Sequence, residues 1–167
     1  MQRNNGESIV RRGNTAVLSD EDLDLQAQTA YCELLVEQSV LSLSEGSGTP
    51  EWFQWATNEL SKLESLPKDW DGDGSIPPPS RVLQVCEAVL SEFGKINSGL
   101  SAPYIVPAVD GRVLFEWRIG ARTLNVEVTT NMNVAFLFRD RELNVSSKGL
   151  LLPHYFPTPF VKALQLF

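Results

Sequence analysis

The stretch that decides the fold is YIVPAVDGRVLFEWRIGARTLNVEVTTNMNVAFLFRDRELNV, residues 104–145. Apolar and polar side chains alternate along it, and short turn-forming segments interrupt the alternation at regular intervals. Because successive side chains on a strand point to opposite faces, this pattern predicts strands that are buried on one side only. We therefore predict a five-stranded antiparallel meander, with one face under helices and the other exposed mostly to water.

The first two turns predict how the strands pair. Asp110-Gly111 favours a two-residue type I′ turn, which would place Val106 opposite Phe115. Gly120-Ala121 would form the next two-residue turn. The pairs that this second turn predicts are Trp117 with Leu124, Phe115 with Val126, and Val113 with Val128.

Two longer loops complete the predicted meander. One is a three-residue loop at 129–131 with Asn131 in the left-handed region, and the other is a four-residue loop at 139–142. All these registers bury the same set of residues, whereas a slip of one residue would turn that set outward. The pairs predicted across the two loops are Val126 with Val134, Leu124 with Phe136, Phe138 with Leu143, and Phe136 with Val145.

Helical periodicity dominates the rest of the chain. Ser19 and Asp22 form a capping box, and apolar residues recur at helical spacing from there to about residue 44. Thr49-Pro50 opens a second helix, which Pro67 ends, and Ser80 is the expected N-cap of a third. The apolar face expected for the second helix consists of Trp52, Trp55, Ala56, Leu60 and Leu63.

These elements predict an α+β fold in which three N-terminal helices pack on one face of the meander. Residues 1–18 are expected to form a flexible polar tail, and 19–152 a single domain. Residues 153–167 are an apolar segment in which Thr158-Pro159 opens a short helix.

Composition narrows the possible partners. The chain has 21 acidic and 14 basic residues, a net charge of −7, which argues against direct nucleic-acid binding because phosphates require clustered cations. A protein partner more basic than the chain fits better, and self-association is left open. No apolar run is long enough to span a membrane, and the N-terminus lacks the apolar core of a signal peptide. With Cys32 and Cys86 isolated, we expect a cytoplasmic protein without disulfides.

The loop DWDGDGSIPPPS, residues 69–80, begins like a calcium-binding EF-hand loop. Asp69, Asp71 and Asp73 occupy the first three ligand positions, and Gly74 the position of the sharp turn. Ser80 stands where a bidentate glutamate is needed, and prolines precede it. An acidic turn pinned by Trp70 explains the same residues, since aspartates accept backbone N–H bonds and glycines adopt positive φ. We expect this structural turn and no cofactor, with weak calcium binding as the alternative.

A family resemblance rests on this loop and on the first hairpin. Its pattern is leucine-proline, two residues, W-D-G-x-G-A/S and a proline, followed downstream by D-G-x-V-x-x-E-W. This resembles a family of small, uncharacterised bacterial proteins, and the likeness covers about residues 63–138. It implies a recurring module and no known activity. The positions that match are Leu66, Pro67, Trp70, Asp71, Gly72, Gly74, Asp110, Gly111, Val113, Glu116 and Trp117.

Catalysis has little support. The single histidine, His154, lies beyond the meander, and neither cysteine has an activating histidine nearby in the sequence. Asp71 and Glu116 would serve a metal-dependent hydrolase if the fold brought their carboxylates together. Pairing of Glu116 with its neighbours on the exposed face of the sheet is the simpler expectation.

We therefore expect a non-catalytic interaction module: a regulatory, antitoxin-like or immunity-like protein, or an accessory subunit. Its expected partner-binding residues are Trp52, Phe156, Phe160 and Leu164, with acidic residues steering the encounter. The alternative for these four side chains is that they complete the core of the chain itself. The other candidate functions are a cation- or small-ligand-binding module centred on the acidic loop, and the hydrolase with Asp71 and Glu116.

Overall fold

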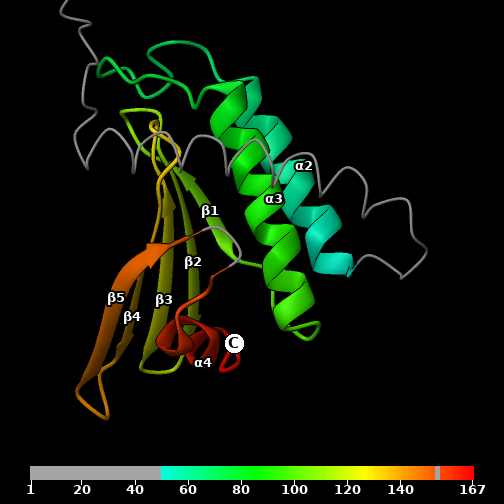
Figure 1. Cartoon of the computed structure of the whole chain (residues 1–167). Coiled ribbons are helices and arrows are strands. Elements are labelled where there is room, and N and C mark those ends of the chain that lie inside the picture. The colour runs from blue at the N-terminus through cyan, green and yellow to red at the C-terminus, as the bar shows by residue number, and fades with distance from the viewer. Residues whose placement is uncertain (1–49, 153–154) are drawn as a thin grey trace, which may run out of the picture.

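The computed structural model describes residues 50–152 and 155–167, and the helix expected over 19–44 lies outside them. The α+β class is confirmed: among the described residues, two helices precede a five-stranded antiparallel sheet and one follows it (Figure 1). The elements are α2 (Glu51–Glu64), α3 (Ser80–Ile96), β1 (Tyr104–Pro107), β2 (Val113–Ile119), β3 (Arg122–Val128), β4 (Val134–Asp140), β5 (Val145–Leu151) and α4 (Thr158–Leu164).

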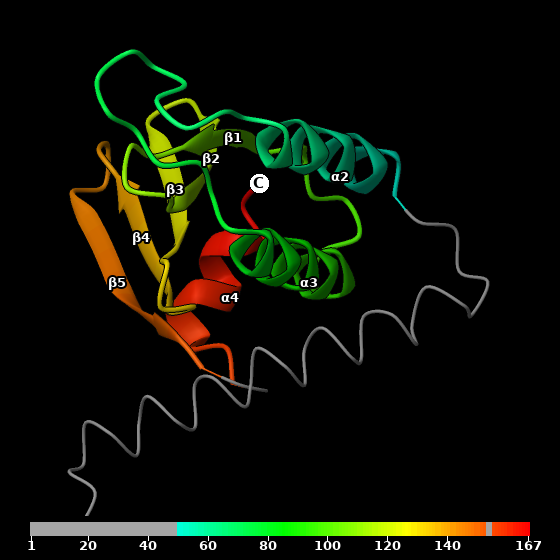
Figure 2. The ribbon, with the colours of Figure 1, turned by 90° about the horizontal axis from the view of Figure 1, so that it is seen from above.

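The strands follow one another in the order β1-β2-β3-β4-β5, as a meander requires. Seen from above, the three helices lie on the same side of the sheet (Figure 2). α2 packs on α3 and on β1, whereas α4 contacts α3, β4 and β5. Among the described helices, none has the length and apolar character needed to cross a membrane.

The predicted pairing of β2 with β3 is confirmed, including Trp117 with Leu124 and Phe115 with Val126. The predictions for the next two hairpins are wrong by an even number of residues. Val126 pairs with Phe136 instead of Val134, because the turn loop is Thr130–Met132 and the left-handed residue is Met132 (φ 62°). β4 extends to Asp140, which pairs with Val145 and so moves Phe136 opposite Gly149. Even slips leave the strand residues on their predicted faces, but Leu143 and Val145, which were predicted to be buried with Phe138 and Phe136, are 68% and 50% exposed.

The predicted β1 register is wrong by one residue. Ile105, not Val106, pairs with Phe115. Gly111 N–H donates to the Ala108 carbonyl and Ala108 N–H donates to the Arg112 carbonyl, so the turn contains three residues and not two. The extra residue turns Val106 outward, where 46% of it is exposed.

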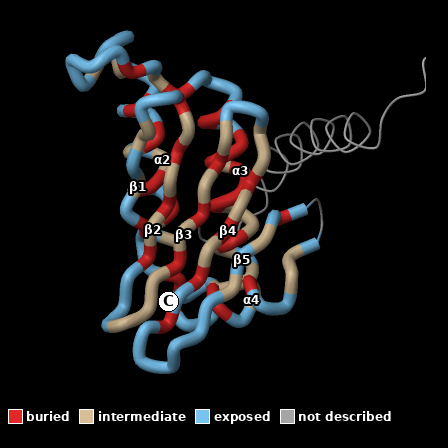
Figure 3. The backbone as a smooth tube through the Cα atoms, turned by 90° about the vertical axis from the view of Figure 1, so that its left-hand side faces the viewer, coloured by how far each residue is buried: buried red, intermediate tan, exposed pale blue. Residues whose placement is uncertain are grey.

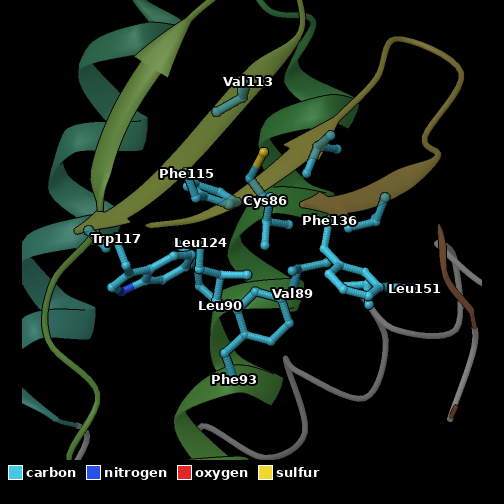
Figure 4. Packing of buried hydrophobic residues seen from close by; sticks show 14 of the residues in the cluster. Cys86, Val89, Leu90, Phe93, Val113, Phe115, Trp117, Leu124, Phe136 and Leu151 are labelled. Atoms are coloured by element: carbon cyan, nitrogen blue, oxygen red, sulfur yellow. The ribbon is translucent and has the colours of Figure 1, made fainter. Parts of the chain in front are cut away.

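The core lies between the helices and the inner face of the sheet. Side chains of α3, among them Cys86, Val89, Leu90 and Phe93, face those of the strands (Figure 4). Burial alternates along β2, β3 and β4, as expected for strands covered on one face (Figure 3). The outer face is less polar than expected, since it also carries Tyr104, Val106 and Leu150.

The buried face of α2 differs from the expected one at its first turn. Phe53 is buried together with Ala56, Leu60 and Leu63, whereas Trp55 is 42% exposed. Ser80 and Thr158, the predicted N-caps, are instead the first helical residues of α3 and α4, and the N-caps are Pro79 and Pro157, one position earlier. Proline at these positions fixes a φ that suits the entry to a helix.

Candidate functional site

The acidic loop between α2 and α3 is held by hydrogen bonds within its own backbone and side chains. Asp69 has a left-handed conformation (φ 64°), and its N–H donates to the Ser75 carbonyl at 2.8 Å. Its carboxylate Oδ1 accepts the N–H of Gly74 at 2.6 Å. Gly72 and Gly74 have φ of 79° and 85°, which only glycine adopts without strain. The loop therefore has a defined shape before it meets any ligand.

Asp71 organises the centre of this loop. Its Oδ1 accepts the N–H of Asp73 at 2.9 Å and that of Ser75 at 3.3 Å. These hydrogen bonds, that from Asp73 first and then those from Ser75, hold the pKa of the exposed Asp71 carboxyl below its usual value. Asp71 is thus fully ionised at neutral pH, and its contacts are those of an acidic turn.

The loop is fastened to the β1–β2 hairpin. Ile76 N–H donates to the Val109 carbonyl at 2.8 Å, and Ile76 forms a parallel bridge with Asp110. A Cβ on Gly111 would lie 3.4 Å from the Pro77 carbonyl oxygen, so the proline run passes close to the hairpin. Gly111 also has a positive φ of 85°, so the turn favours glycine at this position.

Asp110 is the acidic residue of the turn between β1 and β2. Its carboxylate forms an ion pair with Arg112 (Nε to Oδ2, 2.7 Å), and Arg112 also pairs with Glu127 on β3. The Arg112 guanidinium lowers the pKa of Asp110, chiefly through this hydrogen bond. The carboxylate is half-exposed and ionised at neutral pH.

Acidic and apolar side chains meet on this part of the molecule. Ile76 is 53% exposed and Val109 60% exposed, although a backbone hydrogen bond holds them side by side. We call this area the loop–hairpin surface; its residues are Asp69, Asp71, Asp73, Ile76, Val109 and Asp110. Exposed apolar side chains with polar residues around them mark sites where proteins bind one another.

The expected partner-binding residues lie elsewhere, and two of them do not reach the surface. Phe160 and Leu164 have no exposed area, so they complete the core and cannot contact a partner. Phe156 is half-buried, with its ring 6.0 Å from that of Phe93. Trp52 is half-buried against α3, where a Cβ on Gly94 would approach its ring to 3.3 Å.

The carboxylates proposed for hydrolysis have separate partners. Asp71 accepts backbone N–H groups of its own loop, whereas Glu116 lies on the outer face of β2 and pairs with Arg118. Among residues 50–152 and 155–167, no three histidine, cysteine, aspartate or glutamate side chains are grouped so as to hold a metal ion. Calcium binding by Asp69, Asp71 and Asp73 stays a prediction.

Cys86, the cysteine among the described residues, does not lie where it could act as a nucleophile. Cys86 is buried on α3, and burial raises the pKa of its thiol well above the usual value. Its sulfur is therefore a neutral thiol packed in the core, not a nucleophile. Cys32 and His154 lie outside the described residues.

Comparison with known proteins gives no match, whether to family models, to curated proteins or to solved structures.

Sequence reasoning missed Ile76 and Val109. In the sequence, Ile76 stands within the acidic loop and Val109 directly before the Asp110-Gly111 turn. Their pairing is a contact between segments far apart in the chain, and no local periodicity signals it. An isoleucine within a polar turn was the one hint, because such a side chain has nothing of its own loop to cover it.

The loop geometry predicts a specific stability difference between two glycines. Gly74→Ala should lower the free energy of unfolding by about 1 kcal/mol, because alanine disfavours positive φ. Nothing lies within 4 Å of the added methyl group, so the cost comes from the backbone alone. Gly99→Ala is the matched control, since Gly99 lies in a loop without positive φ. Urea unfolding of both variants measures the difference, and equal stabilities would contradict the loop conformation.

Proposed function

We propose that this chain is a non-catalytic protein-interaction module, a regulatory, antitoxin-like, immunity-like or accessory subunit, whose loop–hairpin surface binds a basic segment of a partner. The observation that carries the proposal is the backbone hydrogen bond from Ile76 to Val109, which holds two exposed apolar residues in adjacent segments, beside the ionised Asp110 and in the same loop as Asp71. In this arrangement the apolar pair supplies burial and the aspartates supply attraction for cations.

The rigidity of this surface favours binding. Its hydrogen bonds and positive-φ residues fix the loop before a partner arrives, so little conformational entropy is lost on association. Asp71 and Asp110 stay charged at neutral pH, which speeds the encounter with a basic partner at low salt.

The test removes the apolar pair and leaves the charges unchanged. The tagged full chain and its Ile76→Ser/Val109→Ser variant are used for affinity purification from the native host, with quantification by mass spectrometry. Recovery of a stoichiometric companion should fall at least about tenfold in the variant, since burying one aliphatic side chain is worth about 1.5–3 kcal/mol. Both residues are more than half exposed, so the fold should be retained.

Ile119→Ser is the matched control, because Ile119 is 46% exposed and lies at the other end of β2. It should retain the companion. If wild type captures no stoichiometric companion, or if the double variant retains it fully, the proposal is wrong.

A further inference from the structure

A second surface lies at the opposite edge of the sheet, around β5, which is the last strand of the meander (Figure 1). Large apolar side chains collect on this strand and beside it with much of their area exposed. They are Leu143 (68%), Val145 (50%), Leu150 (49%), Leu152 (42%) and Tyr155 (60%). The loop–hairpin surface does not include these residues, so a role for the β5 edge is independent of the function proposed for that surface.

The backbone of β5 has unpaired groups on its outer side. The hydrogen bonds from Thr129 N–H to the Asn133 carbonyl and from Arg141 N–H to the Ala121 carbonyl fix which residues of β4 bond to β3. Because bonding alternates along an antiparallel strand, Phe136, Phe138 and Asp140 must bond to β5 instead.

Their partners are Gly149, Ser147 and Val145. The N–H and carbonyl groups of Ser146, Lys148 and Leu150 therefore point away from the sheet. Beyond them, the Leu152 carbonyl accepts the N–H of Tyr155, which closes that end of the edge. In the described part of the chain, no strand pairs with the outer side of β5. We call residues 146–150 the free edge.

Positive charge accompanies the free edge. Lys148 and Arg139 are exposed on the outer face of the sheet, and Arg139 lies directly opposite Ser146. Neither forms an ion pair within the described residues. Two uncompensated cations beside unpaired backbone groups favour a strand that carries a negative charge.

A second copy of the chain fits this edge poorly. In the antiparallel two-fold arrangement that uses all three outward residues, Ser146 pairs with Leu150 of the other copy and Lys148 pairs with Lys148. Like charges directly opposite each other destabilise a strand pair, and an edge lysine is a common feature of strands that do not self-associate.

We propose that the free edge of β5 accepts an extended segment of a partner protein as a sixth strand, with an acidic residue opposite Lys148. Backbone hydrogen bonds to Ser146, Lys148 and Leu150 supply the affinity, and Lys148 with Arg139 supplies the preference for the acidic residue. In an antiparallel pairing, an apolar residue three positions beyond the acidic one lies opposite Val145 and covers it.

Amide hydrogen exchange on the free full-length chain is the first test. The amides of Ser146, Lys148 and Leu150 should exchange fast, and those of Ser147, Gly149 and Leu151 slowly. Protection of the first three in dilute protein would mean that the chain covers its own edge. Protection that grows with protein concentration would mean pairing of two copies. Either result overturns the proposal.

A defined peptide is the second test. The probe is Thr-Val-Thr-Val-Glu-Val-Thr-Val-Thr, and its counterpart has lysine in place of the glutamate. The glutamate peptide should bind at least about tenfold more tightly, measured by fluorescence anisotropy, and should slow exchange at the three outward amides. In Lys148→Glu the preference should reverse. No binding, equal binding of both peptides, or binding without amide protection overturns the proposal.

Ser146→Pro provides a check that does not depend on charge. Proline removes an N–H that points away from β4, so it should abolish peptide binding while the β4–β5 ladder and the melting temperature are retained. If that variant fails to fold, the reversal in Lys148→Glu still decides the proposal. A folded Ser146→Pro that binds the glutamate peptide as tightly as wild type would overturn it.

Discussion

Replacing Phe160 by alanine is expected to lower the free energy of unfolding by about 3–5 kcal/mol. The side chain is fully buried, and its ring centroid lies 5.0 Å from that of Phe93, 5.2 Å from Phe136 and 5.7 Å from Phe156. These rings belong to α3, β4 and the segment before α4, so alanine would leave a cavity where three parts of the fold meet. Urea unfolding followed by tryptophan fluorescence measures the loss.

Tyr155→Ala is the control for this prediction, since 60% of Tyr155 is exposed although it lies only a few residues away. Its effect should stay within about 0.5 kcal/mol. A loss below about 1 kcal/mol for Phe160→Ala would mean that α4 contributes little to the core. The two variants thus separate a core residue from a surface residue within one apolar segment.

Trp117→Ala should cost a similar amount, about 3–5 kcal/mol. Trp117 is 1% exposed, and its ring packs against those of Phe93 and Phe115. Its Nε1–H also donates to the Ser101 carbonyl at 2.8 Å, in the link between α3 and β1. Removing the indole therefore creates a cavity and leaves that carbonyl without its partner.

A series at this position separates the two effects. Trp117→Phe keeps most of the apolar volume and loses the hydrogen bond, so it should cost less than Trp117→Ala. Trp55→Ala is the control, because Trp55 is 42% exposed on α2 and should change stability by less than about 1 kcal/mol. If Trp117→Phe were as damaging as Trp117→Ala, the hydrogen bond would be the larger contribution.

The sequence predicts the faces of the strands better than their registers. Phe136 is buried as the alternation indicates, yet its partner is Gly149 and not Val145. A shift by an even number of residues preserves every face, so hydrophobic patterning cannot detect it. Register then depends on turn length, and the turn around Met132 required a left-handed methionine that no turn preference signals.

In the first hairpin, the sequence indicates where the turn lies but not how many residues it contains. Asp110-Gly111 correctly indicated a turn, but the dipeptide also occurs where a type I turn is followed by a left-handed glycine. That third residue changes the register by one and turns Val106 to the surface. The proline run also passes close to this glycine, and this contact has no signature in the hairpin itself.

Some features of the candidate site could be predicted from the sequence, and others could not. The acidic turn followed from its residues, because aspartates and glycines have local reasons to adopt it, and Asp71 forms the expected backbone contacts. The burial of Phe160 and Leu164 could not be deduced, because an apolar helix has the same sequence pattern whether it covers its own chain or a partner. Ile76 and Val109 required the three-dimensional contact.

Cys86 gives this protein an internal reporter of opening. Its thiol lies between α3 and the sheet, so a labelling reagent reaches it only when that helix separates from the strands. In a chain with Cys32 replaced by serine, the labelling rate would report how often the two layers separate. Addition of a partner that binds the folded form should slow labelling in proportion to occupancy, even for a partner bound far from the sulfur.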